Sequence, residues 1–355
     1  MLAAIRNLNY ARPEKEVIEM SEGHLPWMDD VEPEGRWRSS SRPIDMRIGY
    51  SEVYSGEVGR RSDFVRETTR FLDANGFDSV WLPEHVVLFD EYTSEYPYGT
   101  PGRQAVTRTR PEAGNEGVRG FMDGVVLAAM IAQHSERMRV GTYIVILGQR
   151  NPVVFARQVA TLDQVTDGRV NLGVGVGWSQ QEYESLGVPF ERRGARVDEY
   201  IDAMRALWVD DPSEFHGEFA DFGPLRAHPK PLQQPHPPIL VGGQSRRGIR
   251  RAAEKGDGLI LYNLEIRDIE ICLDELDRCL DGTERSLADM NVVVGRRNEG
   301  RDEESWDADR QFIEECRSMG VISEVVCSPR FPAGDAWFAY MEQYVDALGL
   351  AGADR

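Results

Sequence analysis

The stretch that decides the fold is GRVNLGVGVGW, residues 168–178, which continues from an Asp-Gly turn. Residues 169–176 alternate between apolar and small side chains, and this pattern predicts a buried β-strand. One face of that strand carries no side chains, because every second residue is a glycine: Gly173, Gly175 and Gly177. Such a face leaves room for a flat ligand or for the close approach of another backbone segment. A third interpretation is that the glycines only ease packing inside a barrel.

The polar run 179–182 after Trp178 predicts the start of a helix. Ser179 is the expected N-cap, with Glu182 three residues later as in a capping box. Backbone N–H groups at such a strand-to-helix turn form a natural anion site. Alternating glycines also occur in dinucleotide-binding folds. Here, however, the third glycine comes too early for G-x-G-x-x-G, and no acidic residue ends a second strand about 20 positions later. A Rossmann fold is therefore the weaker interpretation.

Composition narrows the class of protein. The chain has 355 residues, which suggests about two domains, although α/β barrels of this length form one. The net charge of −19 argues against nucleic acid or an anionic membrane as the main partner. No apolar run approaches the roughly 18 residues of a membrane span. The four cysteines show no paired motif, so we expect no metal site, no disulfide framework and a cytoplasmic protein with reduced thiols.

A repeating pattern of short apolar strand, turn and amphipathic helix begins after residue 44. The expected strands are 46–50, 78–82, 139–147, 169–176, 238–241, 258–262, 291–294 and 322–327. The expected helices are 62–75, 123–134, 152–166, 196–209, one ending at Lys255, 266–280, 303–319 and 336–348. Eight strands alternating with eight helices predict a (β/α)8 TIM barrel over residues 45–350.

Three segments interrupt or precede this pattern. Residues 1–44 predict an N-terminal extension, with Trp27 and Trp37 as its expected anchors on the body. The polar segment 90–120 is long enough to be a lid or binding loop. Residues 215–222 predict a small hairpin.

In a TIM barrel, the chemistry lies at the carboxyl ends of the strands. This rule selects four places along the chain. They are Glu84-His85, Tyr143 to Leu147, Gly177-Trp178 and Gly242 to Ser245.

Three stretches resemble the bacterial luciferase-like monooxygenase family, and specifically its deazaflavin (coenzyme F420)-dependent oxidoreductase branch. The first runs from VGTYIVILGQRNPVVFARQ to RRGARVDEY, residues 140–200. The second is PKPLQQPHPPILVGGQSRRGIRRAAEKGDGLI, and the third is FLDANGFDSVWLPEHV near the front of the chain. The resemblance implies a (β/α)8 barrel that binds FMN or coenzyme F420 at the strand ends.

The resemblance also implies roles for individual residues. Tyr143-Ile144 matches a bulge, often with a cis peptide bond, that supports the ring from behind. Glu84-His85 matches an acidic-His pair at the reacting edge of the ring. The residues expected to bind the cofactor are Tyr143, Ile144, Gly175, Gly177, Trp178, Ser179, Gln181, Gly242, Gly243, Gln244 and Ser245. Some relatives in that branch have a catalytic glutamate where this chain has Trp178, so acid–base chemistry would fall to His85 or to the substrate.

His85 is the strongest catalytic candidate, because an imidazole gives or takes a proton near neutral pH. Glu84 either contacts the cofactor or orients His85. The preferred function is hydride transfer between a deazaflavin and a small organic substrate. The alternatives are a monooxygenase that receives reduced FMN from a separate flavin reductase, and a barrel that binds flavin without turnover. The partners considered are a small-molecule substrate, a reductase and a second copy of the chain as a homodimer.

Overall fold

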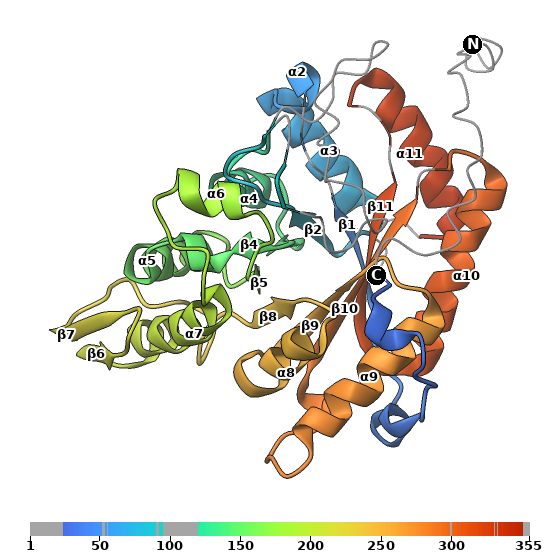
Figure 1. Cartoon of the computed structure of the whole chain (residues 1–355). Helices are drawn as coiled ribbons and strands as arrows, with labels where there is room; N and C mark the ends of the chain where they lie inside the picture. The colour runs from blue at the N-terminus through green and yellow to red at the C-terminus, as the bar shows by residue number, and fades with distance from the viewer. Residues whose placement is uncertain are drawn as a thin grey trace.

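Eight parallel strands form a closed barrel with helices around it (Figure 1). This computed structural model describes residues 24–51, 54, 56–89, 92–94, 120–298, 300–329, 331 and 333–350. The strands, in order around the barrel, are β1 (Arg47–Ser51), β2 (Ser79–Leu82), β3 (Arg139–Thr142), β5 (Val170–Gly175), β8 (Ile239–Gly242), β9 (Gly258–Tyr262), β10 (Asn291–Asn298) and β11 (Ile322–Pro329). Strand β11 pairs with β1 and so closes the sheet. The predicted TIM barrel is confirmed.

The outer helices also follow the predicted order. They are α3 (Ser62–Ala74), α4 (Gly124–Ala132), α5 (Pro152–Val165), α7 (Arg193–Val209), α8 (Arg246–Lys255), α9 (Ile266–Leu280), α10 (Glu303–Met319) and α11 (Asp335–Leu348). Side chains that accept backbone N–H groups cap several of them, including Asp123 before α4 and Asn151 before α5. The short helices α2 (Gly56–Gly59) and α6 (Gln180–Ser185) lie in connections, and β6 (Ser213–His216) with β7 (Asp221–Leu225) forms the predicted hairpin.

Side chains fill the interior of the barrel, so it is a packed core. The inward-facing cluster consists of Trp81, Leu240, Ile260, Val293 and Val326. Their neighbours along each strand point outward into the larger core under the helices. At the amino end of the strands, the buried carboxylate of Glu324 accepts a hydrogen bond from the Trp81 indole at 2.7 Å and pairs with Arg47 at 3.1 Å. The packed interior leaves the carboxyl ends of the strands as the place for a ligand.

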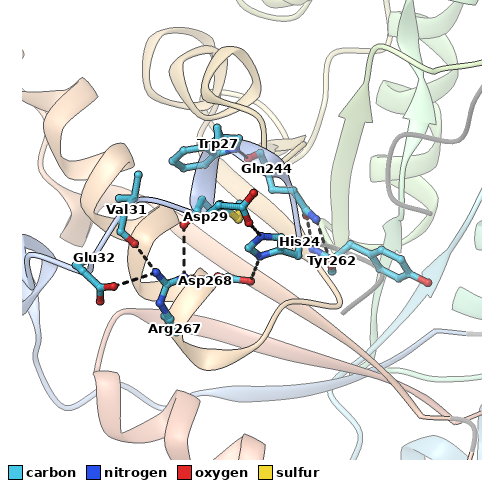
Figure 2. Close-up of polar contacts among 10 residues, drawn as sticks. His24, Trp27, Asp29, Val31, Glu32, Gln244, Tyr262, Arg267 and Asp268 are labelled. Carbon is cyan, nitrogen blue, oxygen red and sulfur yellow. Dashed lines mark hydrogen bonds and ion pairs between the residues drawn. The ribbon is translucent and has the colours of Figure 1, made fainter. Parts of the chain in front are cut away.

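The segment of residues 24–44, called the N-terminal strap below, lies along α9 (Figures 1 and 2). The buried carboxylate of Asp274 on α9 accepts the backbone N–H groups of Glu34, Gly35 and Trp37 at 2.6–3.4 Å. Trp37 is only 3% exposed, as expected of an anchor.

Short 3-10 turns lie in the strap and after α9. They are η1 (Pro26–Met28) and η2 (Arg36–Ser40) in the strap, and η4 (Leu287–Asp289) after α9.

His24 links the strap to α9 through two carboxylates. Its ring nitrogens lie 2.6 Å from Asp268 and 2.7 Å from Asp29, and only the protonated imidazole can donate to both carboxylates. Burial lowers the pKa of His24, but the hydrogen bonds to Asp268 and Asp29 outweigh burial, so its pKa is raised. Arg267 forms an ion pair with the other oxygen of Asp268 at 3.3 Å.

The pKa of His24 is higher in the folded protein than in the unfolded chain. The stability that protonated His24 contributes through Asp268 and Asp29 is therefore complete below the unfolded pKa of about 6.5, and it is lost as the pH rises through the folded pKa. We expect His24→Gln to lower the thermal unfolding midpoint at about pH 5.5 and to have little effect at about pH 8.5. Calorimetry of both proteins at the two pH values measures this. An equal loss at both values would show that the protonated ring adds nothing.

Three further expectations from the sequence concern membrane spans, the cysteines and the long loop after β2. Within the described residues, no helix is both long and apolar enough to cross a membrane. The four cysteines are free thiols, and burial raises the pKa of Cys316 and Cys327 to about 12. Most of the predicted loop 90–120, including Tyr96 and Tyr98, lies outside the described residues; Tyr92, Thr93 and Ser94 lie within them.

Candidate active site

The third strand of the barrel is interrupted by a bulge. Strand β3 pairs with β5 through Gly141 and Asn171, and its continuation β4 (Val145–Ile146) pairs with β5 through Val145 and Val174. Three residues therefore separate the two paired stretches on this strand, against two on β5, which is the signature of a bulge. The peptide bond between Tyr143 and Ile144 is cis. This confirms the predicted backbone distortion.

The bulge fills the bare face of the glycine-rich strand. A Cβ atom added to Gly175 would overlap Cδ1 of Ile144, and one added to Gly242 on β8 would lie 2.7 Å from Cγ2 of the same side chain. A Cβ atom on Gly177 would lie 2.6 Å from Cγ2 of Ile146. The interpretation that a ligand ring lies directly on Gly175 is therefore wrong, because Ile144 occupies that space. The glycines permit the close approach of the bulge instead.

Tyr143, like Ile144, packs against the inward-facing cluster, and its ring reaches across the barrel toward β10. A Cβ atom on Gly295 of β10 would overlap its hydroxyl, so the absence of a side chain there makes room for the ring. The Tyr143 ring centroid lies 6.1 Å from that of Trp81 and 6.0 Å from that of Tyr262. Tyr143 thus covers the packed interior at the level where the mouth of the barrel begins.

His85 follows strand β2 and is held by a buried carboxylate. Its Nδ1 lies 3.0 Å from Oε2 of Glu182, and the other oxygen of Glu182 accepts the N–H of Val86 at 2.7 Å. Glu182 is fully buried on α6, where its own N–H is capped by Ser179. Because the carboxylate accepts at Nδ1, Nε2 is the nitrogen that His85 can present to a substrate. This arrangement suits a positioned acid or base.

Glu182→Gln keeps an oxygen for the Val86 N–H but removes the charge beside His85. We expect the variant to lower turnover by about 10–100-fold, which is less than the full rate enhancement from a positioned acid or base. Cofactor affinity should be unchanged. Glu184→Gln, an exposed carboxylate on the same helix, is the matched control. Steady-state kinetics and a cofactor titration on both variants measure this. Full activity in Glu182→Gln would show that the carboxylate does not assist His85.

Glu84 lies behind the bulge. Its carboxylate forms an ion pair with Arg150 and accepts the N–H of Ile146 at 3.3 Å. Burial raises the pKa of Glu84, although the adjacent Arg150 opposes this effect. The expectation that Glu84 orients His85 is wrong, because Glu182 is hydrogen bonded to that imidazole. Glu84 and Arg150 instead fix the strand that follows the cis peptide bond.

Aromatic side chains surround His85 at the mouth of the barrel. The His85 ring centroid lies 5.6 Å from that of Phe121 and 6.0 Å from that of Trp178. The Trp178 ring lies 4.7 Å from Tyr92, which comes from the long loop after β2. The same loop is tied to α6, where Gln181 accepts the Thr93 N–H at 2.7 Å. Trp178 therefore belongs to the wall beside His85, and Gln181 holds the adjoining loop.

The loop of residues 242–245 joins β8 to α8 and has the features of an anion site. Gly243 has a φ of +146°, and an added Cβ atom would meet only the Cα of Gly248, at 3.7 Å. Ser245 caps α8 by accepting the Gly248 N–H at 3.1 Å. First-turn N–H groups of a helix lack partners within the helix and point toward any bound anion. Since β5 and β8 are neighbours, this loop lies beside the loop after Gly177.

Gln244 has a structural part in the same loop. Its side-chain amide donates to the Tyr262 carbonyl at 3.3 Å and accepts the Tyr262 N–H at 3.0 Å. Both ends of the amide thus bind the backbone after β9, and the side chain is 1% exposed. Gln244 holds the loop in place.

No cluster of three or more metal-binding side chains occurs among the described residues.

Glu182, Arg150 and Arg193 are site residues that were not predicted from the sequence. Arg193 donates to the Gly177 carbonyl at 3.0 Å and so fixes the turn after β5. For Glu182 a signal was present, since the Ser-x-x-Glu spacing placed it on the first turn of α6. The pattern predicted that its side chain would return to the Ser179 backbone, whereas it reaches His85, 97 residues earlier in the chain.

Known proteins share sequence or fold with this chain. The model of the luciferase-like monooxygenase family matches residues 46–319. An uncharacterized protein of Mycobacterium tuberculosis is 35% identical over 228 residues, covering 64% of this chain and 73% of that protein. The FMNH(2)-dependent dimethylsulfone monooxygenase of Pseudomonas putida is 32% identical over 157 residues, 43% of each chain. A solved F420-dependent secondary alcohol dehydrogenase has the same fold, with a TM-score of 0.63, 17% identity, and coverage of 86% of this chain and 99% of that one.

Proposed function

Because the chain belongs to the luciferase-like monooxygenase family, we propose that it transfers a hydride between coenzyme F420 and a small organic substrate. The observation that carries this proposal is the His85–Glu182 pair beside the bulge, at the carboxyl ends of β2, β3 and β5. The resemblance of residues 140–200 to the deazaflavin branch supports the choice of coenzyme.

The residues at the mouth fit such a coenzyme. Ile144, backed by Gly175 and Gly242, presents a firm apolar surface against which a flat ring could rest. The open backbone at Gly243 and the first turn of α8 would hold a phosphate group. Trp178 would lie against the ring or the substrate on the side of His85. The bound deazaflavin would supply or accept the hydride.

The chain itself supplies the proton. During reduction of a carbonyl, the carbon gains the hydride and the oxygen needs one proton, which Nε2 of His85 would give. During oxidation of an alcohol, Nε2 would take that proton as the hydride leaves the carbon. Glu182 keeps the ring oriented and stabilises the imidazolium in either direction. The aromatic rings around His85 would limit the access of water to the reacting groups.

A titration tests the proposed coenzyme. The purified protein is titrated with coenzyme F420 and with FMN, each oxidised and reduced, following absorbance and fluorescence. We expect micromolar or tighter binding of coenzyme F420. If FMN binds at least tenfold more tightly, a difference of about 1.4 kcal/mol, the proposal is wrong about the coenzyme.

The second candidate is a monooxygenase that uses reduced FMN. It is favoured by the 32% sequence identity, over 157 residues, to a relative named as an FMNH(2)-dependent dimethylsulfone monooxygenase. Such an enzyme would need a flavin reductase as partner, and oxygen consumption with reduced FMN would identify it. A barrel that binds either cofactor but reacts with no substrate is the third reading, and retention of the His85–Glu182 pair weighs against it.

A further inference from the structure

The strap contacts the proposed anion loop directly. The indole N–H of Trp27 donates to the Gln244 carbonyl at 3.0 Å, from a position 217 residues earlier in the chain (Figure 2). The guanidinium of Arg246, the first residue of α8, lies 5.1 Å from the Trp27 ring centroid, within the range of a cation–π contact. Trp27 therefore touches the chain on both sides of Ser245.

The contact at the Gln244 carbonyl has a consequence for the neighbouring amide. The peptide unit between Gln244 and Ser245 is planar and is not among the cis bonds, so its carbonyl and its N–H point in opposite directions. A donor fixed on the carbonyl thus directs the Ser245 N–H away from the strap. Gln244 is also held from β9, through its side chain and Tyr262. The orientation of this peptide is therefore set from two sides.

Trp27 can fix that peptide because the strap is itself firmly attached. Met28, the next residue, is completely buried. Arg267 on α9 donates to the carbonyls of Met28 at 3.4 Å and Val31 at 2.7 Å, and His24 binds Asp268 on the same helix (Figure 2). The indole is consequently a fixed donor rather than a mobile surface side chain.

We infer that the N-terminal strap sets the coenzyme affinity of the barrel, with Trp27 as the positioning residue for the loop of residues 242–245. The inference rests on the proposed function, since it assumes that this loop binds the phosphate of the coenzyme. The strap precedes residue 46, where the match to the family model begins. The strap orders the loop before the coenzyme binds and so reduces the entropy that binding must overcome.

Trp27→Phe tests this inference, because it keeps an aromatic ring for Arg246 and removes only the donor to Gln244. Trp37→Phe is the matched control: Trp37 lies in the same strap, is buried, and its indole nitrogen has no hydrogen-bond partner among the described residues. We expect Trp27→Phe to raise the Kd for coenzyme F420 by about three- to tenfold, as for loss of one hydrogen bond. We expect the Kd of Trp37→Phe to stay within twofold of wild type, whatever its unfolding midpoint.

Hydrogen exchange on the wild-type protein gives a second test that requires no variant. If the strap favours coenzyme binding, the bound coenzyme must stabilise the strap by the same free energy. We therefore expect saturating coenzyme F420 to slow exchange in a peptide that contains residues 27–31, with residues 213–225 of the hairpin unchanged. An unchanged strap peptide in the saturated protein would overturn the inference.

The outcomes separate the two proposals. If the wild type binds neither coenzyme F420 nor FMN, the proposed function fails. If the wild type binds and Trp27→Phe binds within twofold of it, the positioning role of Trp27 fails while the function stands. If both tryptophan variants lose affinity equally, the strap acts only through general stability, and the inference is again overturned.

Discussion

Replacing His85 by alanine should lower turnover by about 10²–10⁴-fold, the usual yield of a positioned acid or base. Removing the imidazole leaves Glu182 buried without the ring that it orients, and water would have to replace His85 as the proton donor to the substrate oxygen. Coenzyme affinity should change little, because the anion loop after β8 and the Ile144 surface are untouched. Turnover is measured as the change in coenzyme absorbance with a series of small ketones and secondary alcohols.

His216→Ala is the control for this variant. His216 is exposed on the hairpin and pairs with Asp221, on the connection between α7 and β8 rather than at the mouth. The control should retain wild-type turnover and coenzyme affinity. Unchanged turnover in His85→Ala, with a substrate that the wild type converts, would return His85 to a structural role.

Replacing Gly175 by alanine should both destabilise the barrel and weaken coenzyme binding. The new methyl group would overlap Cδ1 of Ile144, so the Ile144 side chain would have to leave its present position. Overpacking of this kind costs about 1–3 kcal/mol of stability. Because Ile144 forms the surface proposed to support the ring, we expect the Kd for the coenzyme to rise at least about tenfold, or 1.4 kcal/mol. Calorimetry and the coenzyme titration measure the two effects.

Ile144→Val offers a specific rescue, since it removes the Cδ1 atom that the new methyl group would meet. In the double variant Gly175→Ala with Ile144→Val, we expect both stability and affinity to recover part of the loss, a coupling that a double-mutant cycle measures. Gly223→Ala on β7 is the control, because no atom lies within 4 Å of its added Cβ. Additive losses in the double variant would show that the two side chains do not compete for one space.

The sequence predicted the fold well because the apolar pattern that marks each strand or helix lies within a few consecutive residues. Residues 169–176 predicted β5 from alternation alone. The strands differ from the prediction in the break of 139–147 into β3 and β4 and in the extra length of β10 and β11. The rule that chemistry lies at the carboxyl ends of barrel strands placed His85 and the loop after β8 at the mouth. The cis bond at Tyr143-Ile144 followed from the family resemblance, since neither residue type predicts it.

The partners of the site residues could not be predicted in the same way. A carboxylate has several donors within reach, and a sequence pattern does not decide among donors on distant elements. Glu182 was expected to complete a capping box, and Glu84 was expected either to contact the cofactor or to orient His85. In the structure each binds a group on another strand or helix, His85 in one case and Arg150 in the other. The bare face of Gly175 was likewise compatible with a ligand or with protein, and the bulge fills it.

A crystal structure of the protein with bound coenzyme F420 would test the central claim most directly. We expect the ring to rest against Ile144, with its reacting edge beside Nε2 of His85 and its phosphate at Gly243 and the first turn of α8. A coenzyme bound away from the mouth, or at the mouth with its reacting edge turned away from His85, would contradict the proposed site and its chemistry.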